Sequence, residues 1–242
     1  MNDARRALVT GGSGGIGAVI CRTLAAAGCF VYVHANRSKE AADAVVGGII
    51  AAGGQAQTVA FDVTDTAAAR AALGPLIEHA PIQILVNNAG IHDDAAFPGM
   101  SAEQWSRVVD VAVDGFYNVT QPLLLPMIHT RWGRIINISS VTALKGNRGQ
   151  VNYAAAKGAL NAATKALSLE VASRGITVNA VAPGIIAAGM GAPAFDAATI
   201  ANLVPMKRAG TAAEVASLVG YLASNEAAYI TGQVISVNGG MY

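Results

Sequence analysis

The stretch TGGSGGIG, residues 10–17, follows a short apolar run and leads into a segment of helical period. Glycines are needed where a chain turns sharply from strand to helix and its backbone approaches a pyrophosphate, whose charge is held by amides at the helix N-terminus. The stretch therefore predicts a dinucleotide-binding loop formed by Gly11, Ser13, Gly15, Ile16 and Gly17. The alternative is a glycine-rich turn that binds no ligand.

Outward from this loop, short β-type runs alternate with longer alanine-rich segments of helical period. The β-type runs lie at 7–10, 29–34, 57–61, 84–88, 134–139, 177–182 and 233–238. Several are continuously apolar, as expected for strands buried on both faces. We expect an α/β fold, a single-domain Rossmann-type doubly wound sheet of about seven mainly parallel strands with helices on both faces. No linker divides residues 1–242, so one domain is expected.

Helix ends are marked by turn and capping residues. The marked positions are Gly28, Ser38 and the capping-box pairs Ser101 with Gln104 and Thr211 with Glu214. Pro122 and Pro126 should bend or interrupt the long helix that begins near Ser101.

The composition favours a soluble, cytoplasmic protein. Hydrophobic residues make up 53% of the chain and charged residues 13%, and the mean hydropathy is +0.43, but much of the apolar content is alanine and glycine. Because no window is apolar enough for a spanning helix, and the first residues lack the pattern of a signal peptide, neither is expected. The net charge is +1 with scattered basic residues, which argues against nucleic acid or an anionic membrane as a partner.

The metal-ligating residue types form no recognisable cluster. Cys21 and Cys29 fall in or beside the first helix and second strand, where small buried thiols are common, so both are expected to be reduced. No metal-ligand spacing is matched by the four histidines, His34, His79, His92 and His129. We expect no metal site.

The end of the second predicted strand indicates which dinucleotide fits. A carboxylate there would bind the ribose 2′-hydroxyl of NAD and repel the extra phosphate of NADP. The chain has HANRS instead, in which Arg37 can pair a 2′-phosphate bidentately, although Gly14 occupies the loop position of a possible second cation. NADP(H) is therefore favoured over NAD(H). The expected contacts of the adenosine half are Asn36, Arg37, Ser38, Asp62 and Val63, with a helix or turn cap as the alternative for Asp62.

Three residues form a candidate catalytic set. Tyr153 and Lys157 lie four residues apart in NYAAAKGAL, so on a helix they share one face about one turn apart. Ser140 ends the apolar run RIINISS, upstream of both. A phenol has a pKa of about 10, which a nearby cation lowers by favouring the phenolate. The set predicts a tuned proton donor and a hydroxyl that holds a substrate oxygen, although the Tyr–Lys spacing alone also arises by chance.

Together with NNAG at 87–90 and PG at 183–184, these motifs resemble the short-chain dehydrogenase/reductase family in order and spacing over essentially the whole chain. Within it, GRIINISS, NYAAAKGAL, EVASRGITVNAVAPG and VNGGMY are most similar to the 3-oxoacyl-[acyl-carrier-protein] reductases. The resemblance implies a homotetramer packed through helices at about 101–130 and 150–174 and through the C-terminal strand.

The resemblance also implies residue roles. Tyr153 would protonate the carbonyl oxygen as hydride arrives from nicotinamide C4, Lys157 would lower the tyrosine pKa and hold the nicotinamide ribose, and Ser140 would hydrogen-bond the substrate oxygen. The further cofactor contacts that it implies are Asn88, Ala89 and Gly90 along the adenosine half and Pro183, Gly184 and Ile186 towards the carboxamide.

Two positions depart from the family pattern. Ala112 stands where an asparagine usually helps to hold a water that relays protons to the lysine, and Ala188 stands where a threonine usually touches the cofactor. We expect the reaction to survive, with looser cofactor binding or slower turnover, because acid, cation and hydroxyl are all present.

Residues 184–210 are mostly apolar and are expected to form a mobile flap that suits an acyl chain, or else a surface loop tucked onto the core. Their larger side chains are Ile185, Ile186, Met190, Phe195, Leu203 and Met206. Arg131 and Arg174 end two helices expected on the same side of the sheet, where they could meet an acidic acyl carrier protein. Solvated helix-end cations explain them equally well.

The leading hypothesis is NADPH-dependent reduction of a 3-oxoacyl thioester, linked to acyl carrier protein or CoA, to the 3-hydroxyacyl thioester in fatty acid or related polyketide or polyene synthesis. One alternative is a dehydrogenase of another alcohol or ketone, such as a sugar, polyol, steroid or aromatic ketone. Another is a catalytically weak NADP(H)-binding pseudoenzyme, which Ala112 and Ala188 keep open.

Overall fold

Seven strands form one sheet in the order β3-β2-β1-β4-β5-β6-β7 in the computed structural model, which describes residues 4–187 and 196–242. Every neighbouring pair is parallel. The strands are β1 (Arg6–Val9), β2 (Phe30–Ala35), β3 (Gln55–Ala60), β4 (Ile84–Asn87), β5 (Gly133–Ile138), β6 (Ile176–Pro183) and β7 (Val234–Val237). The predicted α/β fold is confirmed, and all seven strands are parallel.

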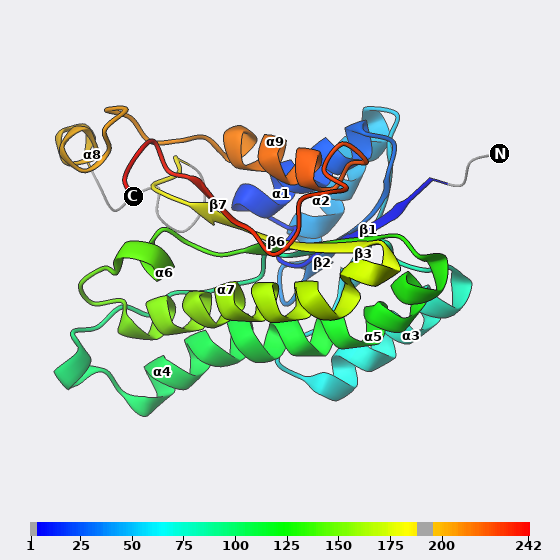
Figure 1. The fold of residues 1–242 in the computed structure, drawn as a ribbon, viewed down its shortest axis with the longest axis horizontal. Helices are drawn as coiled ribbons and strands as arrows, with labels where there is room; N and C mark the ends of the chain where they lie inside the picture. The colour runs from blue at the N-terminus through cyan, green and yellow to red at the C-terminus, as the bar shows by residue number, and fades with distance from the viewer. Residues whose placement is uncertain (1–3, 188–195) are drawn as a thin grey trace.

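Helices lie in two layers, one on each face of the sheet (Figure 1). One layer contains α1 (Gly15–Ala26), α2 (Lys39–Ala51) and α9 (Ala212–Leu222). The other contains α3 (Thr66–His79), α4 (Ala102–Val109), α5 (Gly115–Thr130) and α7 (Val151–Val171). Ile20, Leu24 and Val219 are buried in the first core, and Leu123 and Met127 are buried in the second. Strands covered on both faces carry apolar residues on both, which explains the continuous apolar runs.

The short elements lie mainly in the connections. They are α6 (Thr142–Lys145), α8 (Ala197–Leu203), the 3₁₀ turns η1 (Phe97–Gly99) and η3 (Ala172–Arg174), and the π-helical segment η2 (Asp110–Asp114). Both predicted capping boxes are present, Ser101 with Gln104 at α4 and Thr211 with Glu214 at α9.

The prolines of α5 do not interrupt it. Pro122 and Pro126 both lie inside the helix, and the break in α-helical geometry falls earlier, at η2. A proline removes one backbone donor but leaves the rest of the helical hydrogen bonds, and packing in the second core holds the remaining turns. Of the two expected effects, an interruption at the prolines is wrong, and a bend of α5 stays a prediction.

The order of the strands reverses between β1 and β4. From β1 the chain proceeds outward to β2 and β3, then returns to the other side of β1 and proceeds to β7. In such sheets the crevice outside the carboxyl ends of the strands, at the reversal, is where ligands bind. The glycine loop follows β1, and NNAG overlaps and follows the end of β4, so both motifs meet there.

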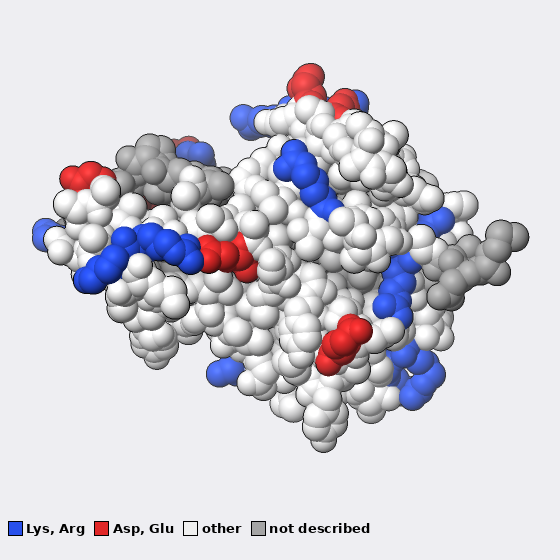
Figure 2. Space-filling view, turned by 90° about the horizontal axis from the view of Figure 1, so that it is seen from above, with Lys and Arg blue, Asp and Glu red and all other residues white. Residues whose placement is uncertain are grey.

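The surface of the protein carries no large patch of like charge among the described residues on the face shown in Figure 2. Figure 2 shows the α1, α2 and α9 layer from above, with charged side chains in small groups separated by uncharged atoms. Within residues 4–187 and 196–242, no helix is both long and apolar enough to cross a membrane. Over the same ranges, no group of three His, Cys, Asp or Glu side chains is placed to hold a metal.

Cys21 and Cys29 are free and buried, and burial raises the pKa of Cys21 to about 12.

Candidate active site

A cavity of about 540 Å³ opens at the carboxyl ends of the strands. It brings together most of the residues singled out in the sequence, which come from segments far apart in the chain. The predicted residues that line it are Gly11, Ser13, Gly15, Ile16, Gly17, Asn88, Ala89, Gly90, Ser140, Tyr153, Lys157, Pro183, Gly184 and Ile186. The glycine loop and the candidate catalytic set thus share one site.

The glycine loop is shaped to accept a phosphate. Gly11 has φ +62°, and a Cβ at Gly17 would overlap the carbonyl oxygen of Gly11. The N-terminus of α1 follows Gly14, which is extended and has no side chain to cap the first N–H groups. Because these donors face the cavity beside an open glycine backbone, the residues present fit a pyrophosphate.

His34, which was not predicted as a site residue, holds the glycine loop through a hydrogen bond to Gly11. Its Nδ1 accepts a hydrogen bond from the Gly11 N–H at 3.0 Å, and its Nε2 lies 2.9 Å from the Phe61 carbonyl oxygen. The first bond requires an unprotonated Nδ1, so Nε2 is the donor. Burial lowers the pKa of His34 to about 4. Nothing in the sequence marks this histidine except its place near the end of β2.

The predicted adenosine contacts lie beyond the residues that line the cavity, at the ends of β2 and β3. Asn36 Nδ2 donates to Asp62 Oδ2 at 3.0 Å, and Asp62 Oδ1 accepts from the Thr64 N–H at 2.9 Å. Asp62 therefore caps a turn, which is the alternative role that the sequence left open for it. Val63 is 4% exposed and packs in the second core. Arg37 is exposed, and no carboxylate of the described residues lies within ion-pair distance of it.

The candidate catalytic residues converge from β5 and α7. Tyr153 and Lys157 lie on α7, and Ser140 follows the end of β5. Lys157 is buried, its Nζ donates to the Ile138 carbonyl oxygen at 2.8 Å, and it lies 5.7 Å from the centroid of the Tyr153 ring. Burial lowers the pKa of Lys157 to about 8.

The pKa of Tyr153 differs from the expectation. Burial of the phenol raises it to about 12, the Ser140 hydrogen bond acts in the opposite direction, and the Asp94 charge adds to the rise. The predicted lowering of this pKa is therefore wrong for the protein alone, because loss of hydration outweighs the Ser140 hydrogen bond. At neutral pH the phenol keeps the proton that an acid must donate.

A buried polar ladder supports α7 against the sheet. Asn87 Nδ2 donates to Asn137 Oδ1 at 2.9 Å, and Asn137 Nδ2 donates to Thr164 Oγ1 at 2.8 Å. The ladder links β4, β5 and α7, so the helix that carries Tyr153 is held in a fixed position relative to the strand that precedes Ser140.

The first departure from the family pattern lies beside this set. Ala112 is in η2, 5% exposed, in an apolar cluster with Ala156 and Tyr153. Its methyl group can hold no water, so a proton relay through this side chain is not possible. The second departure, Ala188, lies outside the described residues.

One wall of the cavity is polar and was missed by the sequence reasoning. The side chains that form it are His92, Asp94, Thr142, Lys145, Asn147 and Gln150. Gln150 Nε2 donates to Asp94 Oδ2 at 2.8 Å, and Gln150 Oε1 accepts from Thr142 Oγ1 at 3.2 Å and Asn147 Nδ2 at 3.0 Å. These residues lie in loops and a one-turn helix, where no periodicity signals which side chains meet.

The facing wall is partly apolar. Ile185, Ile186 and Leu203 line the cavity together with Met241. Met206 is 67% exposed instead. Two further apolar side chains of the expected flap, Met190 and Phe195, lie outside the described residues.

The two helix-end arginines share one side of the sheet, as expected, but not the side of the cavity. Arg131 Nη2 donates to the Ser173 carbonyl oxygen at 3.2 Å, next to Arg174. Both precede the first residues of β5 and β6, at the amino edge. Because the cavity opens at the carboxyl edge, neither arginine flanks it within one chain.

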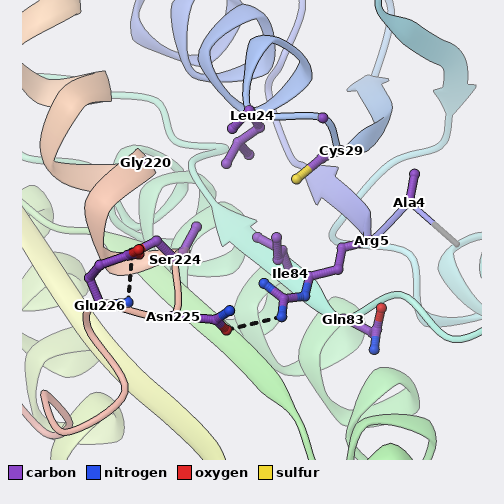
Figure 3. Close-up of a pocket in the computed structure, with 13 residues that line it drawn as sticks. Ala4, Arg5, Leu24, Cys29, Gln83, Ile84, Gly220, Ser224, Asn225 and Glu226 are labelled. Carbon is purple, nitrogen blue, oxygen red and sulfur yellow. Dashed lines mark hydrogen bonds between the residues drawn. The ribbon is translucent and has the colours of Figure 1, made fainter. Parts of the chain in front are cut away.

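A second cavity, of about 570 Å³, lies at that amino edge (Figure 3). Arg5, Cys29 and Glu226 are among its lining residues, and Arg5 Nη2 donates to Asn225 Oδ1 at 3.0 Å. None of the predicted site residues lines it. The cavity at the carboxyl edge is therefore the candidate active site, because Tyr153, Lys157 and the glycine loop all line it.

Comparisons with known proteins agree with this geometry. The family model described as short chain dehydrogenase matches residues 5–199. A 3-oxoacyl-[acyl-carrier-protein] reductase FabG from Aggregatibacter actinomycetemcomitans is 44% identical over 236 residues, 97% of this chain and 98% of the relative. An acetoacetyl-CoA reductase from Acinetobacter sp. is 41% identical over 100% of this chain and 99% of the relative, and nodulation protein G from Azospirillum brasilense is 42% identical over 97% of each. The chain therefore belongs to the short-chain dehydrogenase/reductase family.

Proposed function

We propose that the protein is an NADPH-dependent reductase that converts a 3-oxoacyl thioester, linked to acyl carrier protein or CoA, to the 3-hydroxyacyl thioester. Family membership implies a nicotinamide dinucleotide cofactor. The observation that carries the proposal is the convergence of Ser140, Tyr153 and Lys157 in one cavity with the glycine loop. Two of the relatives named above are, by their names, reductases of such thioesters: the 3-oxoacyl-[acyl-carrier-protein] reductase and the acetoacetyl-CoA reductase.

The side chains would divide the work as follows. The bound dihydronicotinamide supplies a hydride. Tyr153 gives its phenolic proton to the carbonyl oxygen. Ser140 Oγ accepts from the Thr142 N–H at 3.1 Å, so its own hydroxyl hydrogen is available to hold the same oxygen. Lys157 uses one donor on the Ile138 carbonyl and has two left for ribose hydroxyls, and its charge stabilises the phenolate.

The preference for NADP(H) is supported by the exposed end of β2. Arg37 is free of ion pairs within the described part of the chain, and Asn36 is tied to Asp62 beside it. Ser38 precedes α2 without a side-chain capping bond, so its hydroxyl is available to a phosphate. In Arg37→Ala we expect the KM for NADPH to rise about tenfold or more while that for NADH changes little.

Substrate and assembly belong to the same proposal. The apolar wall formed by Ile185, Leu203 and Met241 would take an acyl chain, with residues 184–210 as its flap, within a single domain of residues 1–242. We propose a homotetramer that acts in the cytoplasm, in fatty acid or related polyketide or polyene synthesis. If two copies pair through α5 and α7 about a two-fold axis, their helices run antiparallel. The C-termini of α5 and α7 in one copy then lie beside the N-termini of the same helices in the other. Arg131 and Arg174 would then approach the partner's cavity, where a carrier protein could dock.

The test is NADPH oxidation measured with acetoacetyl and longer 3-oxoacyl thioesters, repeated with NADH. We expect turnover that falls by at least about 10²-fold in Tyr153→Phe, because the acid is lost. Reduction should also decline as the pH rises past about 8, where Lys157 loses its charge. Turnover of a sugar, polyol, steroid or aromatic ketone in place of every thioester would identify another dehydrogenase. NADPH binding with no turnover of any ketone would identify a pseudoenzyme.

A further inference from the structure

Gln150 lies between three segments that build the catalytic cavity. It is the N-cap residue of α7, three residues before Tyr153. Its amide oxygen accepts from Thr142 of α6 at 3.2 Å, and its amide nitrogen donates to Asp94, in the loop after β4, at 2.8 Å. A single side chain therefore ties α6, α7 and the β4 loop together.

The orientation of this amide is fixed by its partners. Asn147 Nδ2 also donates to the Gln150 oxygen, at 3.0 Å, so that oxygen already has two donors. A carboxylate can only accept, which requires the amide NH₂ to face Asp94. The other oxygen of Asp94 lies 3.3 Å from His92 Nδ1. No Lys or Arg of the described ranges is within ion-pair distance of the Asp94 carboxylate.

The same network reaches the catalytic serine. Thr142, which bonds to Gln150 through its hydroxyl, donates its backbone N–H to Ser140 Oγ at 3.1 Å. That bond occupies a lone pair of Ser140 and leaves the hydroxyl hydrogen to point elsewhere in the cavity. If α6 moves relative to α7, the distance between Ser140 and Tyr153 changes as well.

We propose that Gln150 and Asp94 are positioning residues, which lock α6 to α7 so that Ser140 and Tyr153 meet the same substrate oxygen. The inference rests on the proposed function, because it concerns the geometry of that reaction. A displacement of about 1 Å in a reacting group can cost about 10²-fold in rate, so a link of this kind affects turnover without touching the cofactor loop.

The test exchanges the donor and acceptor across the 94–150 contact. In Asp94→Asn the new amide oxygen can still accept from Gln150, so the link between α6 and α7 should survive and amide hydrogen exchange of residues 138–146 should match that of the original protein. In Gln150→Glu two carboxylates face each other, and we expect kcat to fall about tenfold or more while the Kd for NADPH stays within about twofold. In the double variant, the amide introduced at position 94 can donate to the carboxylate introduced at position 150, and kcat should return to within about threefold of the original protein.

A second readout does not depend on activity. Amide hydrogen exchange of the peptide containing residues 138–146 should become faster in Gln150→Glu and return in the double variant. Asp93→Asn is the matched control, because that neighbouring carboxylate bonds instead to Gln104 Nε2 at 2.9 Å and to Arg107 of α4. It should change neither readout.

The possible outcomes separate the two proposals. If Gln150→Glu matches the original protein in kcat and in exchange, or if the double variant is no better than Gln150→Glu, the positioning role is refuted. If neither the original protein nor any variant reduces a ketone, the proposed function fails. Amide hydrogen exchange of residues 138–146 would still show whether Gln150 and Asp94 hold α6 to α7.

Discussion

Gly17 is a residue whose missing side chain is required by its neighbours. A Cβ there would overlap the Gly11 carbonyl oxygen and come within 2.6 Å of Asn88 Nδ2. Asn88 Nδ2 donates to the carbonyl oxygens of Thr10 and Gly11, at 2.9 and 3.1 Å, so these contacts cannot easily relax. The glycine therefore keeps the loop close enough to α1 to present its amides to a phosphate.

Substitutions at Gly17 and Gly14 should differ sharply. We expect Gly17→Ala to lower the free energy of unfolding by about 2 kcal/mol or more and to abolish measurable NADPH binding. A Cβ at Gly14 meets nothing within 4 Å, so Gly14→Ala should cost only about 0.5 kcal/mol. Urea unfolding and NADPH fluorescence titration check both variants. Equal losses in the two would show that close approach at Gly17 is not the reason for the glycine.

His34 should make the fold sensitive to mild acid. Its pKa is about 4 in the folded protein, against an ordinary value of 6.5. Between these pH values His34 is protonated in the unfolded chain but not in the folded protein. The free energy of unfolding is therefore highest above about pH 6.5 and falls as the pH drops towards 4. The loss is of order 3 kcal/mol. Urea unfolding at pH 7.5 and pH 5 should show a smaller drop for His34→Gln than for the original protein. Parallel drops would contradict this reading.

The site residues that the sequence predicted are those whose chemistry requires a particular local spacing. Tyr153 and Lys157 share a helix face, and the glycines of the loop are adjacent in the chain. His34, Asp94 and Gln150 were missed as site residues because each acts through a contact with a residue from a distant segment. Such contacts depend on how strand ends meet at one edge of the sheet, which no local pattern encodes.

At the scale of elements, Arg134 joins the segment after α9 to the turn between α7 and β6. It is 2% exposed, and its Nε donates to the Ser224 carbonyl oxygen, after α9, at 3.0 Å. Its Nη1 donates to the carbonyl oxygens of Gly133 and Gly175, at 2.8 and 3.4 Å, and its guanidinium lies 4.3 Å from the centroid of Trp132. The partial negative charge of these carbonyls, rather than a carboxylate, balances the buried cation.

Removal of this cation should loosen both helix ends. We expect Arg134→Met to lower the free energy of unfolding by about 2–4 kcal/mol, because buried carbonyls lose their donor. Arg174→Met, at an exposed arginine close in sequence to the same edge, should change it by about 0.5 kcal/mol or less. Chemical denaturation of the two variants is the measurement. A loss below about 1 kcal/mol for Arg134→Met would contradict the assigned role.

Element boundaries could be predicted where the side-chain pattern is strong. β6 extends only one residue beyond the predicted 177–182 at each end. β3 begins at Gln55, two residues before its predicted start, because backbone bonds to β2 hold an edge strand whose own residues are largely polar or small. The π-helical turn at η2 could not be predicted, because its residues have no sequence signal different from the α-helix around them.

At the scale of the molecule, the ends of the sheet have different roles. The carboxyl edge holds the candidate active-site cavity, whereas Arg131 and Arg174 lie at the amino edge. The sequence predicted that these arginines share a side. Because each ends a helix or turn that leads directly into a parallel strand, that side is the amino edge, opposite the cavity. In the proposed assembly, a second copy turned end for end would bring these cations to its partner's cavity.

The second helical layer presents apolar residues that such a copy would cover. Leu125 of α5 is 64% exposed and Leu169 of α7 is 84% exposed, and Tyr117 is 56% exposed on the same layer. Water-exposed leucines on adjacent helices favour association, since each loses its hydration when a partner covers it. If glutamates replaced Leu125 and Leu169, association would bury their charges without partners. The free-energy cost of that desolvation exceeds the gain from the remaining contacts of the interface.

We therefore expect sedimentation velocity to give a tetramer for the original protein and smaller species for Leu125→Glu combined with Leu169→Glu. Ile50→Glu is the matched control, because Ile50 is 56% exposed but lies on α2, in the opposite layer, and its change should leave the mass unaltered. Circular dichroism would verify that the double variant is folded. A monomeric original protein, or a double variant of unchanged mass, would contradict an interface on this layer. Either result would also remove the route by which Arg131 and Arg174 reach a cavity.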